Sequence, residues 1–237
     1  MKTSAPVRRN IGFTLVELLV VIGIILILMG LVLAVVPMAK LQAQNVTASG
    51  VARNIVVAVN GYHADYGKFP SLQSDGALDE TKDQRVGDPA MAATIHNNAL
   101  FFTLRAIPKG PNEGDAQNPK RTNYIPYRSA SVSGLQKPRG GFFDRTGDGS
   151  VPPADFDGNL YDPWGREYGV ILDTNGDERI NLEGVYIDFT GADRASGRAP
   201  RFTSGAFSMG KDETLGKKGD RTYRTNSDKS DDIISWE

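Results

Sequence analysis

The sequence predicts an α+β protein, in which a long amino-terminal α-helix packs on a head with a small antiparallel β-sheet and long loops. Three observations support this class. Residues 13–36 are apolar apart from Glu17, apolar residues then recur at helical spacing as far as Tyr66, and the clearest β-rich segments come later in the chain. A helix followed by strands, rather than alternating with them, is typical of α+β proteins.

Residues 13–36 are long enough and apolar enough to cross a membrane. A helix rises about 1.5 Å per residue, and roughly 20 apolar residues span the hydrocarbon core of a bilayer. The leader, residues 1–12, contains Lys2, Arg8 and Arg9 and no acid. Because basic residues favour the cytoplasmic side, we expect the amino end in the cytoplasm and the head outside it.

Glu17 is the unusual residue of this apolar run. An unpaired carboxylate inside a bilayer is costly, so we expect Glu17 to have a partner or a function. Gly12 closes the leader, Phe13 follows it, and Glu17 lies four residues further on. The string Gly-Phe-Thr-Leu-Val-Glu resembles the processing site of type IV prepilins and of type II secretion pseudopilins.

This resemblance implies how the amino terminus matures. In that family a membrane peptidase cleaves after the glycine, here Gly12, and methylates the new terminus, here Phe13. The Phe13 ammonium is then expected to pair with Glu17 of a neighbouring subunit, so that a stacked pair leaves neither charge unmatched. An ordinary signal peptide has a shorter apolar core, and twin-arginine export would account only for the Arg8-Arg9 pair. A plain membrane anchor would explain the length but not the Gly-Phe-x-x-x-Glu spacing.

The helix is expected to continue through residues 37–66 with an amphipathic pattern. One apolar stripe consists of Val51, Ile55, Val59, Tyr62 and Tyr66. Such a stripe is typical of a helix that packs on a globular head. Gly67 and Pro70 are expected to end the helix, and two helices joined at Pro37 are the alternative.

Residues 67–237 are expected to form one extracytoplasmic head. Its first part, residues 72–160, has the composition of an enlarged loop region, in which residues 89–104 favour a short helix and residues 123–128 an extended segment. Its second part, residues 161–237, is expected to carry the sheet and a calcium loop at the carboxyl end.

Four β-rich segments lie in this second part. Residues 168–173 and 184–189 are expected to pair as a hairpin with a long loop, and residues 203–210 and 232–236 are expected to add further strands.

A turn at Asp162-Pro-Trp-Gly165 precedes the first of these strands. Asp-Pro starts a turn, Gly165 permits a positive φ, and Trp164 is a large apolar side chain suited to the core. The string resembles the major pseudopilin of type II secretion, in which a D-P-W-G-x-x-Y turn leads into a strand. The Tyr-Gly-Lys-Phe-Pro string at residues 66–70 resembles the same family more loosely.

An acidic loop in the first part of the head has the spacing of a calcium-binding loop. Calcium takes six to eight oxygen ligands, and in such loops they occupy fixed positions. The candidate ligands are Asp144, Thr146 and Asp148 at the first, third and fifth positions, and Asp155 at the twelfth. A second string, residues 173–177, lacks the expected glycine and the twelfth acid, and is more typical of a hairpin turn.

The carboxy-terminal acids are a separate candidate. Residues 208–212 are Ser-Met-Gly-Lys-Asp, and residues 230–233 are Ser-Asp-Asp-Ile. They resemble the calcium loop of pseudopilins, in which a strand ends in S-x-G-x-D and a later D-x-D-I pair returns to the same ion. The ligands that this resemblance implies are the Met209 carbonyl, Asp212, and Asp231 or Asp232, with Asp228 left open. A solvated acidic tail is the alternative, against which Ile233 and Trp236 indicate a segment that docks.

The composition argues against several other functions. The chain has no Cys and two His, and its formal net charge is −1. This charge gives no electrostatic footprint for binding nucleic acid. Because there is no G-x-S-x-G string, Gly-rich phosphate loop or Cys, we expect no enzyme. An exported domain without disulfides must stabilise its loops in another way, and a bound metal is one such way.

The resemblance implies a structural subunit of a type II secretion pseudopilus, which assembles from the bacterial inner membrane into a helical fibre in the periplasm. The partners expected on this basis are its own subunits, minor pseudopilins, the prepilin peptidase and the inner-membrane assembly platform. A surface type IV pilin for adhesion, motility or DNA uptake is the alternative within the superfamily. A membrane-anchored extracytoplasmic binding module, with residues 72–160 as its site, is the alternative from another class.

Overall fold

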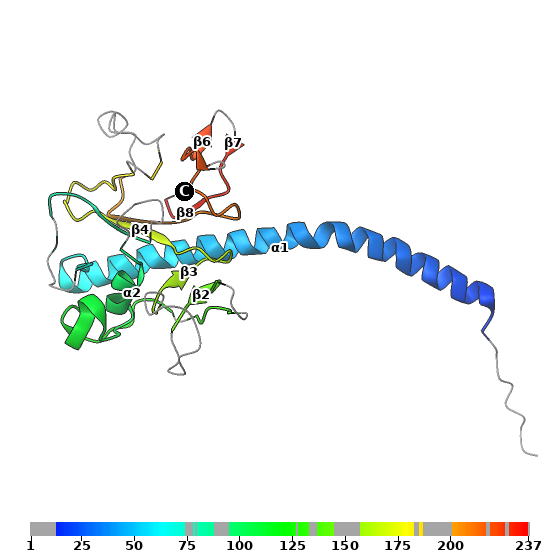
Figure 1. Ribbon diagram of the computed structural model, residues 1–237, viewed down its shortest axis with the longest axis horizontal. Helices are drawn as coiled ribbons and strands as arrows, with labels where there is room; N and C mark the ends of the chain where they lie inside the picture. The colour runs from blue at the N-terminus through cyan, green and yellow to red at the C-terminus, as the bar shows by residue number, and fades with distance from the viewer. Residues whose placement is uncertain are drawn as a thin grey trace, which may run out of the picture. The chain divides into compact units, whose positions relative to one another are not determined.

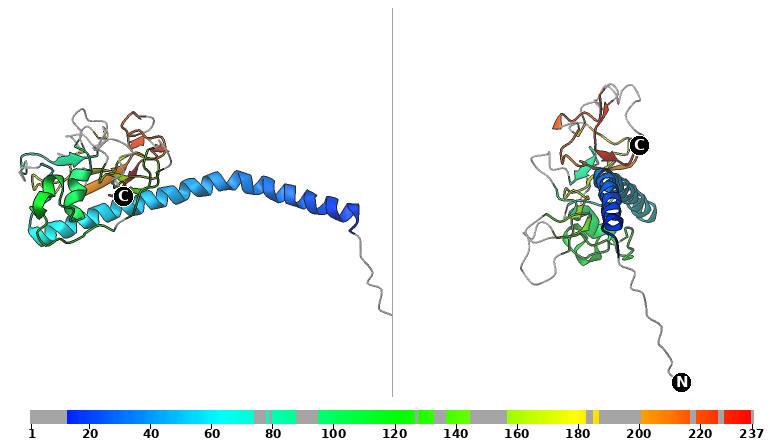
Figure 2. Two further views of the ribbon diagram at one scale, coloured as in Figure 1. Left: turned by 60° about the horizontal axis from the view of Figure 1, so that its bottom comes forward. Right: turned by 90° about the vertical axis from the view of Figure 1, so that its right-hand side faces the viewer.

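The computed structural model divides the chain into two compact units, Met1–Ala43 and Gln44–Glu237. The described residues are 13–73, 78, 80–87, 95–126, 128–132, 137–144, 157–182, 185–186, 201–216, 219–225 and 228–236. One long helix is followed by a four-stranded antiparallel sheet, which confirms the predicted α+β class (Figure 1). Two further views of the same elements are given in Figure 2.

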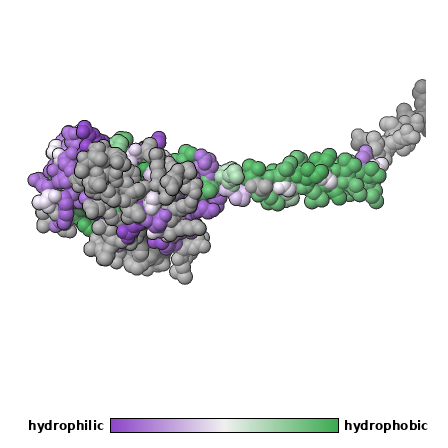
Figure 3. Space-filling view, turned by 90° about the horizontal axis from the view of Figure 1, so that it is seen from above, coloured by the Kyte–Doolittle hydropathy of each residue, from purple (hydrophilic) through white to green (hydrophobic). Residues whose placement is uncertain are grey.

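Helix α1 extends from Leu15 to Tyr66 and contains Pro37. The alternative of two helices joined at Pro37 is therefore wrong, since the missing proline N–H interrupts the hydrogen bonding locally without ending the helix. In the first unit the large apolar side chains of α1 are exposed, and Figure 3 shows the apolar surface that they form. Among the described residues, α1 is the one helix that is long and apolar enough to cross a membrane.

In the second unit, α1 buries the apolar stripe that the sequence predicted. Ile55, Val59 and Tyr62 are fully buried, and Val51 and Tyr66 pack partly buried against the same core. The helix ends at Gly67 as expected, because this glycine has a φ of +68° and its N–H donates to the carbonyl of His63 at 2.8 Å. A residue without a side chain adopts this left-handed conformation with little strain.

The main sheet has the strand order β1-β4-β5-β8, with antiparallel neighbours throughout. Its strands are β1 (Gln84–Val86), β4 (Gly169–Leu172), β5 (Ser204–Ser208) and β8 (Ile233–Ile234). Strands β5 and β8 confirm the predictions for residues 203–210 and 232–236. The hairpin predicted between residues 168–173 and 184–189 is wrong, because β1 and β5 occupy the two sides of β4, and residues 184 and 187–189 lie outside the described residues.

The two faces of this sheet are buried in different cores. Val86, Val170, Leu172 and Ala206 belong to the core that includes α1, whereas Ile171, Phe207, Ile180 and Tyr223 belong to the other. In Figure 1 and Figure 2 the cyan part of α1 lies along the first face. Gly169 lies beneath an aromatic ring, because a Cβ at this position would be 2.1 Å from Phe207 Cζ. The close packing of this ring on the strand therefore requires glycine.

Among the described residues, the second unit also contains two β-ribbons and two short helices. The ribbons are β2 (Gly141–Phe142) with β3 (Leu160–Tyr161), and β6 (Arg224–Thr225) with β7 (Asp228–Lys229). The helices are α2 (Asn98–Leu104) and the 3-10 helix η1 (Gly110–Asp115). Helix α2 confirms the predicted helix from residue 98 onward, and residues 88–94 lie outside the described residues. The segment 123–128 was predicted to be extended. Its described residues belong to no strand.

The turn predicted at Asp162-Pro-Trp-Gly165 is confirmed. Gly165 has a φ of +100°, and Trp164 is 7% exposed. One carboxylate oxygen of Asp162, Oδ1, accepts the N–H groups of Trp164, Gly165 and Arg166 at 2.9, 2.7 and 2.9 Å. Asp162 therefore closes the turn that leads from β3 to β4.

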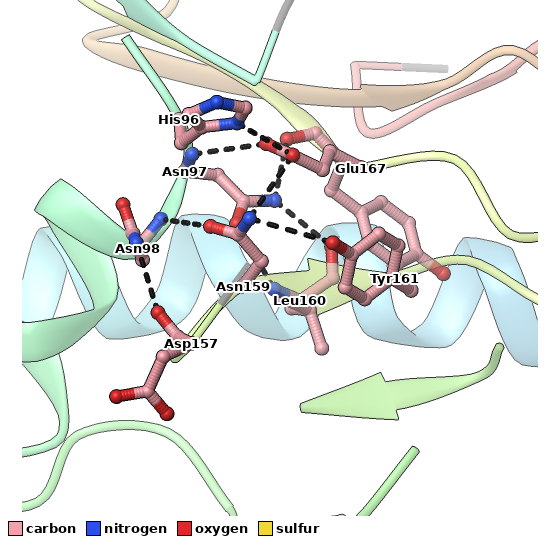
Figure 4. A network of polar contacts seen from close by, with 9 residues as sticks. His96, Asn97, Asn98, Asp157, Asn159, Leu160, Tyr161 and Glu167 are labelled. Atoms are coloured by element: carbon pink, nitrogen blue, oxygen red, sulfur yellow. Dashed lines mark hydrogen bonds and ion pairs between the residues drawn. The ribbon is translucent and has the colours of Figure 1, made fainter. Parts of the chain in front are cut away.

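A polar network fixes the start of α2 on β3 and β4 (Figure 4). The Oδ1 atom of Asn97 accepts the Leu160 N–H at 2.9 Å, and Nδ2 donates to the carbonyls of Leu160 and Tyr168 at 2.9 and 3.1 Å. The Glu167 carboxylate lies 2.8 Å from His96 Nδ1 and accepts the Asn97 N–H at 3.1 Å. Asn97 therefore satisfies backbone groups of β3 and of Tyr168, the residue just before β4, and the contacts of His96 are those of a structural residue.

Candidate functional site

The first candidate site is the amino-terminal end of α1. Phe13 is 77% exposed, and Gly12 lies outside the described residues. Thr14 directly precedes the helix, and its carbonyl accepts the N–H of Leu18 at 3.3 Å. The Oε2 atom of Glu17 accepts both the Thr14 N–H at 2.9 Å and the Thr14 hydroxyl at 2.7 Å. The Glu17 N–H donates to Thr14 Oγ1 at 3.2 Å, so the two residues are bonded reciprocally.

These contacts form a capping box, and Thr14 is a residue that the sequence reasoning missed. In such a box the N-cap hydroxyl binds an N–H of the first turn, while the glutamate three residues later binds the N-cap N–H. The signal was present in the sequence as Thr14-x-x-Glu17 directly before an apolar run. Both Thr14 donors bind Oε2. The Oε1 atom of Glu17 accepts no hydrogen bond from the part of the chain that the structure describes.

The second candidate site is the carboxy-terminal acidic segment. The Oδ2 atom of Asp231 accepts the backbone N–H groups of Lys211 and Asp212 at 2.8 and 3.0 Å. Gly210, just before them, has a φ of +68°, and a Cβ there would be 2.3 Å from the carbonyl oxygen of Asp231. The two segments that the resemblance to a pseudopilin calcium loop paired, residues 208–212 and 230–233, are therefore in direct contact.

Asp232 is the buried acid of this segment, with 2% of its surface exposed. Its Oδ2 atom accepts the Gly216 N–H at 2.7 Å. Its Oδ1 atom is buried and has no hydrogen-bond donor among the described residues. Burial raises the pKa of Asp232 to about 7, and the neighbouring Asp231 acts in the same direction, whereas the Gly216 N–H and the hydroxyls of Tyr186 and Ser230 oppose this shift. A carboxyl group in this position is stable either when protonated or when a cation neutralises it.

The other predicted ligands of this site differ in their surroundings. The Oδ1 atom of Asp212 accepts the Thr214 N–H at 2.9 Å, and Met209 is buried in the core on the second face of the sheet. Asp228 lies in β7, and its side chain is outside the described part of the structure. Ile234 is buried and Trp236 packs against the same core, so the segment docks on the head rather than extending into solvent.

The acidic loop at residues 144–155 is described only at its first position. Both carboxylate oxygens of Asp144 bind the Arg105 guanidinium, at 2.8 and 2.7 Å. The guanidinium carbon also lies 4.2 Å from the centre of the Phe142 ring. The remaining predicted ligands, Thr146, Asp148 and Asp155, lie outside the described residues. Asp144 therefore already has a bidentate cationic partner.

A third acidic group lies where β1 begins and β4 ends. Ligand oxygens of Asp83, Asp173 and Asp177 lie within 4.8 Å of one another, and this is the one group of three such acids among the described residues. Burial and the nearby Asp177 raise the pKa of Asp173. The sequence reasoning saw the string at residues 173–177 as a turn but missed Asp83, because only the pairing of β1 with β4 brings Asp83 beside Asp173.

A comparison with known protein families finds a match at the amino-terminal end of the chain. The family model of the prokaryotic N-terminal methylation motif matches residues 7–33. The matched range includes Phe13, Thr14 and Glu17 and much of the apolar run. No curated protein and no solved structure matches the chain. The motif is that of type IV pilin-like proteins and pseudopilins, and it indicates a membrane-anchored, filament-forming subunit that a prepilin peptidase processes.

Proposed function

We propose that this chain is a structural subunit of a type II secretion pseudopilus, which assembles from the bacterial inner membrane into a helical fibre in the periplasm. One observation carries the proposal. The methylation motif coincides with a helix start at which Glu17 is the single charged residue of an exposed apolar segment. An exposed apolar helix with one acid needs both a membrane and a partner for that acid.

The assembly chemistry follows from the two charges at this end. Cleavage after Gly12 creates an ammonium group on Phe13, within one helical turn of Glu17. In a lone subunit both charges are held in lipid, whereas in a fibre the ammonium of one subunit meets the carboxylate of the next. Two unit charges about 4 Å apart attract by about 4 kcal/mol at an effective dielectric constant of about 20. This pairing favours the stacked state and fixes the register between subunits.

Calcium is the second part of the proposal. Asp232 fits a cation, because its Oδ1 atom is buried and accepts no hydrogen bond from the described residues, and because its pKa is raised to about 7. The residues that would hold the ion are Asp232, Asp212, Asp231 and the Met209 carbonyl, with Asp228 a further candidate. A bound calcium ion would supply the positive charge that permits Asp232 to stay ionised in the folded head.

The carboxy-terminal acids and the absence of cysteine also favour a pseudopilin over a surface pilin. The docked segment that includes Ile234 and Trp236 contains no cysteine, so no disulfide closes it. A surface type IV pilin shares the amino-terminal chemistry and is distinguished by its phenotype. Deleting the gene is expected to stop the export of secreted proteins, while adhesion, motility and DNA uptake continue.

The experiment that tests assembly is Glu17→Ala in the native host, with Asp220→Ala as a matched loss of an exposed acid. Intact-mass measurement reports processing, and microscopy of sheared material reports fibres. Glu17→Ala is expected to be cleaved and folded but to form few fibres, whereas Asp220→Ala is expected to form normal fibres. Normal fibres from Glu17→Ala would exclude the charge-pairing account.

A further inference from the structure

The contacts of Glu213 tie the carboxy-terminal acidic segment to the turn between β3 and β4. We propose that Arg166, in this turn, holds Glu213 and thereby positions the neighbouring Asp212 for calcium. The inference rests on the calcium part of the proposed function. It makes Arg166 and Glu213 positioning residues, which touch the ion's ligands but do not bind the ion themselves.

Glu213 binds cations from two other parts of the head. Its Oε2 atom accepts the Arg166 Nε–H at 3.0 Å and lies 3.5 Å from Lys137 Nζ. The side chains of Arg166 and Glu213 are 34% and 32% exposed, so their pair is partly shielded from water. A shielded pair is screened less by salt than a fully exposed one. Glu213 is therefore anchored to the turn chiefly through Arg166.

The backbone at Glu213 has an unusual conformation that this anchor can hold. Its φ is +58°, in the left-handed region that residues with a side chain seldom adopt. Asp212 comes directly before it and takes part in two contacts of the acidic segment. The Asp212 N–H donates to Asp231 Oδ2 at 3.0 Å, and its Oδ1 atom accepts the Thr214 N–H at 2.9 Å. The direction of the Asp212 carboxylate therefore depends on the conformation of Glu213.

The same turn also holds the other end of this segment. The Asp162 carboxylate accepts the Ser208 hydroxyl at 2.6 Å, and Ser208 is the last residue of β5. Glu213 lies five residues later in the chain. The turn is therefore attached on both sides of Met209 and Asp212, two of the expected calcium ligands.

Preorganisation of the ligands is the consequence. A loop that is already held in place loses less conformational freedom when an ion binds to it. Breaking the ion pair is therefore expected to weaken calcium binding although no ligand is removed. The direction of this effect is informative. By charge alone, loss of a cation such as Arg166 would strengthen the binding of calcium, whereas loss of a positioning contact weakens it.

The test is calorimetric titration of calcium into the full-length chain in detergent micelles. Arg166→Gln is compared with Lys211→Gln, which removes an exposed cation next to Asp212. Arg166→Gln is expected to raise the calcium Kd about fivefold, which corresponds to about 1 kcal/mol. This is the upper end of the range measured for exposed ion pairs. Lys211→Gln is expected to leave the Kd unchanged or to lower it.

A double-mutant cycle and a measurement without calcium complete the test. Glu213→Gln is also expected to raise the Kd. The double variant Arg166→Gln with Glu213→Gln is expected to raise it by less than the product of the two single factors, since both changes remove the same contact. In chelator, NMR is expected to show faster amide hydrogen exchange at Asp212 in Arg166→Gln than in the wild type or Lys211→Gln.

The outcomes separate this inference from the proposed function. A wild-type chain that binds no calcium would overturn the calcium part of the proposed function and this inference with it. If the wild type binds calcium and Arg166→Gln binds it equally or more tightly, only the positioning role is wrong. An equal rise in Kd for Lys211→Gln, single factors that multiply in the double variant, or an unchanged Asp212 amide in Arg166→Gln would each overturn the positioning role as well.

Discussion

The Oδ2 atom of Asp162 accepts the hydroxyl of Ser208 at 2.6 Å, and both residues are fully buried. The other oxygen, Oδ1, accepts the three N–H groups of the turn between β3 and β4. One carboxylate therefore serves donors from two distant parts of the chain. This contact ties the turn to β5, the strand that leads into the carboxy-terminal acidic segment.

Asp162→Ala is expected to destabilise the head by roughly 3 kcal/mol, because it leaves several buried donors without an acceptor. Asp162→Asn is expected to cost less, since its carbonyl oxygen can still accept the turn N–H groups. Urea unfolding of a head fragment starting at Gln44, the first residue of the second unit, measures both effects. The control is Asp220→Ala, an exposed acid whose carboxylate accepts the Thr222 N–H at 2.8 Å. If Asp162→Ala unfolds at the same urea concentration as Asp220→Ala, the turn does not depend on this carboxylate.

Processing gives a prediction for the amino terminus. If the methylation motif at residues 7–33 directs cleavage, the mature chain starts at Phe13 and carries one methyl group on its amine. Intact-mass measurement on protein from native membranes checks this. Replacing Gly12 with a bulky residue, as in Gly12→Leu, is expected to leave the leader attached. A wild-type chain that retains residues 1–12, or one cut well after residue 36, would contradict the prediction.

The long helix and its buried stripe could be predicted from the sequence because their signals are local. Ile55, Val59 and Tyr62 are buried where the helical spacing placed them. The strand partners could not be predicted in this way. Strand β1 is three residues long, and its sequence, Gln-Arg-Val, has no alternating apolar pattern. It nevertheless pairs with β4, on a side where the predicted hairpin partner would have had to pair.

Among the candidate sites, too, residues marked by a local sequence signal could be predicted, and residues brought together by strand pairing could not. Phe13 and Glu17 became candidates through the resemblance of the Gly-Phe-Thr-Leu-Val-Glu string to a prepilin processing site, and the Thr14-x-x-Glu17 string was visible but not used. Asp83 could not be found, because its neighbours Asp173 and Asp177 are remote in sequence and meet it only through strand pairing. A buried Asp232 could not be told from an exposed Asp231 by sequence, since the two residues are adjacent and identical in type.

The pH dependence of stability gives a further prediction. The pKa of Asp232 is raised by burial to about 7, above its value of about 3.9 in an unfolded chain. Between these two values a folded Asp232 binds more protons than an unfolded one, so the contribution of this group to stability is greatest below about pH 4 and is lost as the pH rises toward 7. Burial also raises the pKa values of Asp162 and Asp173, which act in the same direction.

This dependence is measured by urea unfolding of the head between about pH 5 and pH 8 with a chelator present. Asp232→Asn cannot ionise, so it is expected to flatten the loss of stability across this range. A wild-type head whose stability rises with pH in chelator would contradict the assigned direction, as would an Asn variant with the same slope as the wild type.

Calcium binding gives the last prediction. A cation that binds only the folded head stabilises it by RT ln(1 + [L]/Kd), which is about 2.7 kcal/mol at a hundredfold excess over Kd. Magnesium is expected to do less, because it requires tighter octahedral geometry and gives up its water reluctantly. Because the ion needs an ionised Asp232, the calcium increment in thermal stability is expected to grow as the pH rises through about 7.

Three variants of the head locate the ion by thermal melting with chelator, calcium or magnesium. Asp212→Ala and Asp232→Asn are expected to abolish the calcium increment. Asp173→Ala, just after the end of β4, is expected to keep most of it. If Asp173→Ala loses the increment and Asp232→Asn retains it, the ion binds at the group of Asp83, Asp173 and Asp177 instead, since the oxygens there lie within 4.8 Å of one another. If the wild-type head melts at the same temperature in calcium and in chelator, the head needs no cation, and Asp232 is kept neutral by its own proton.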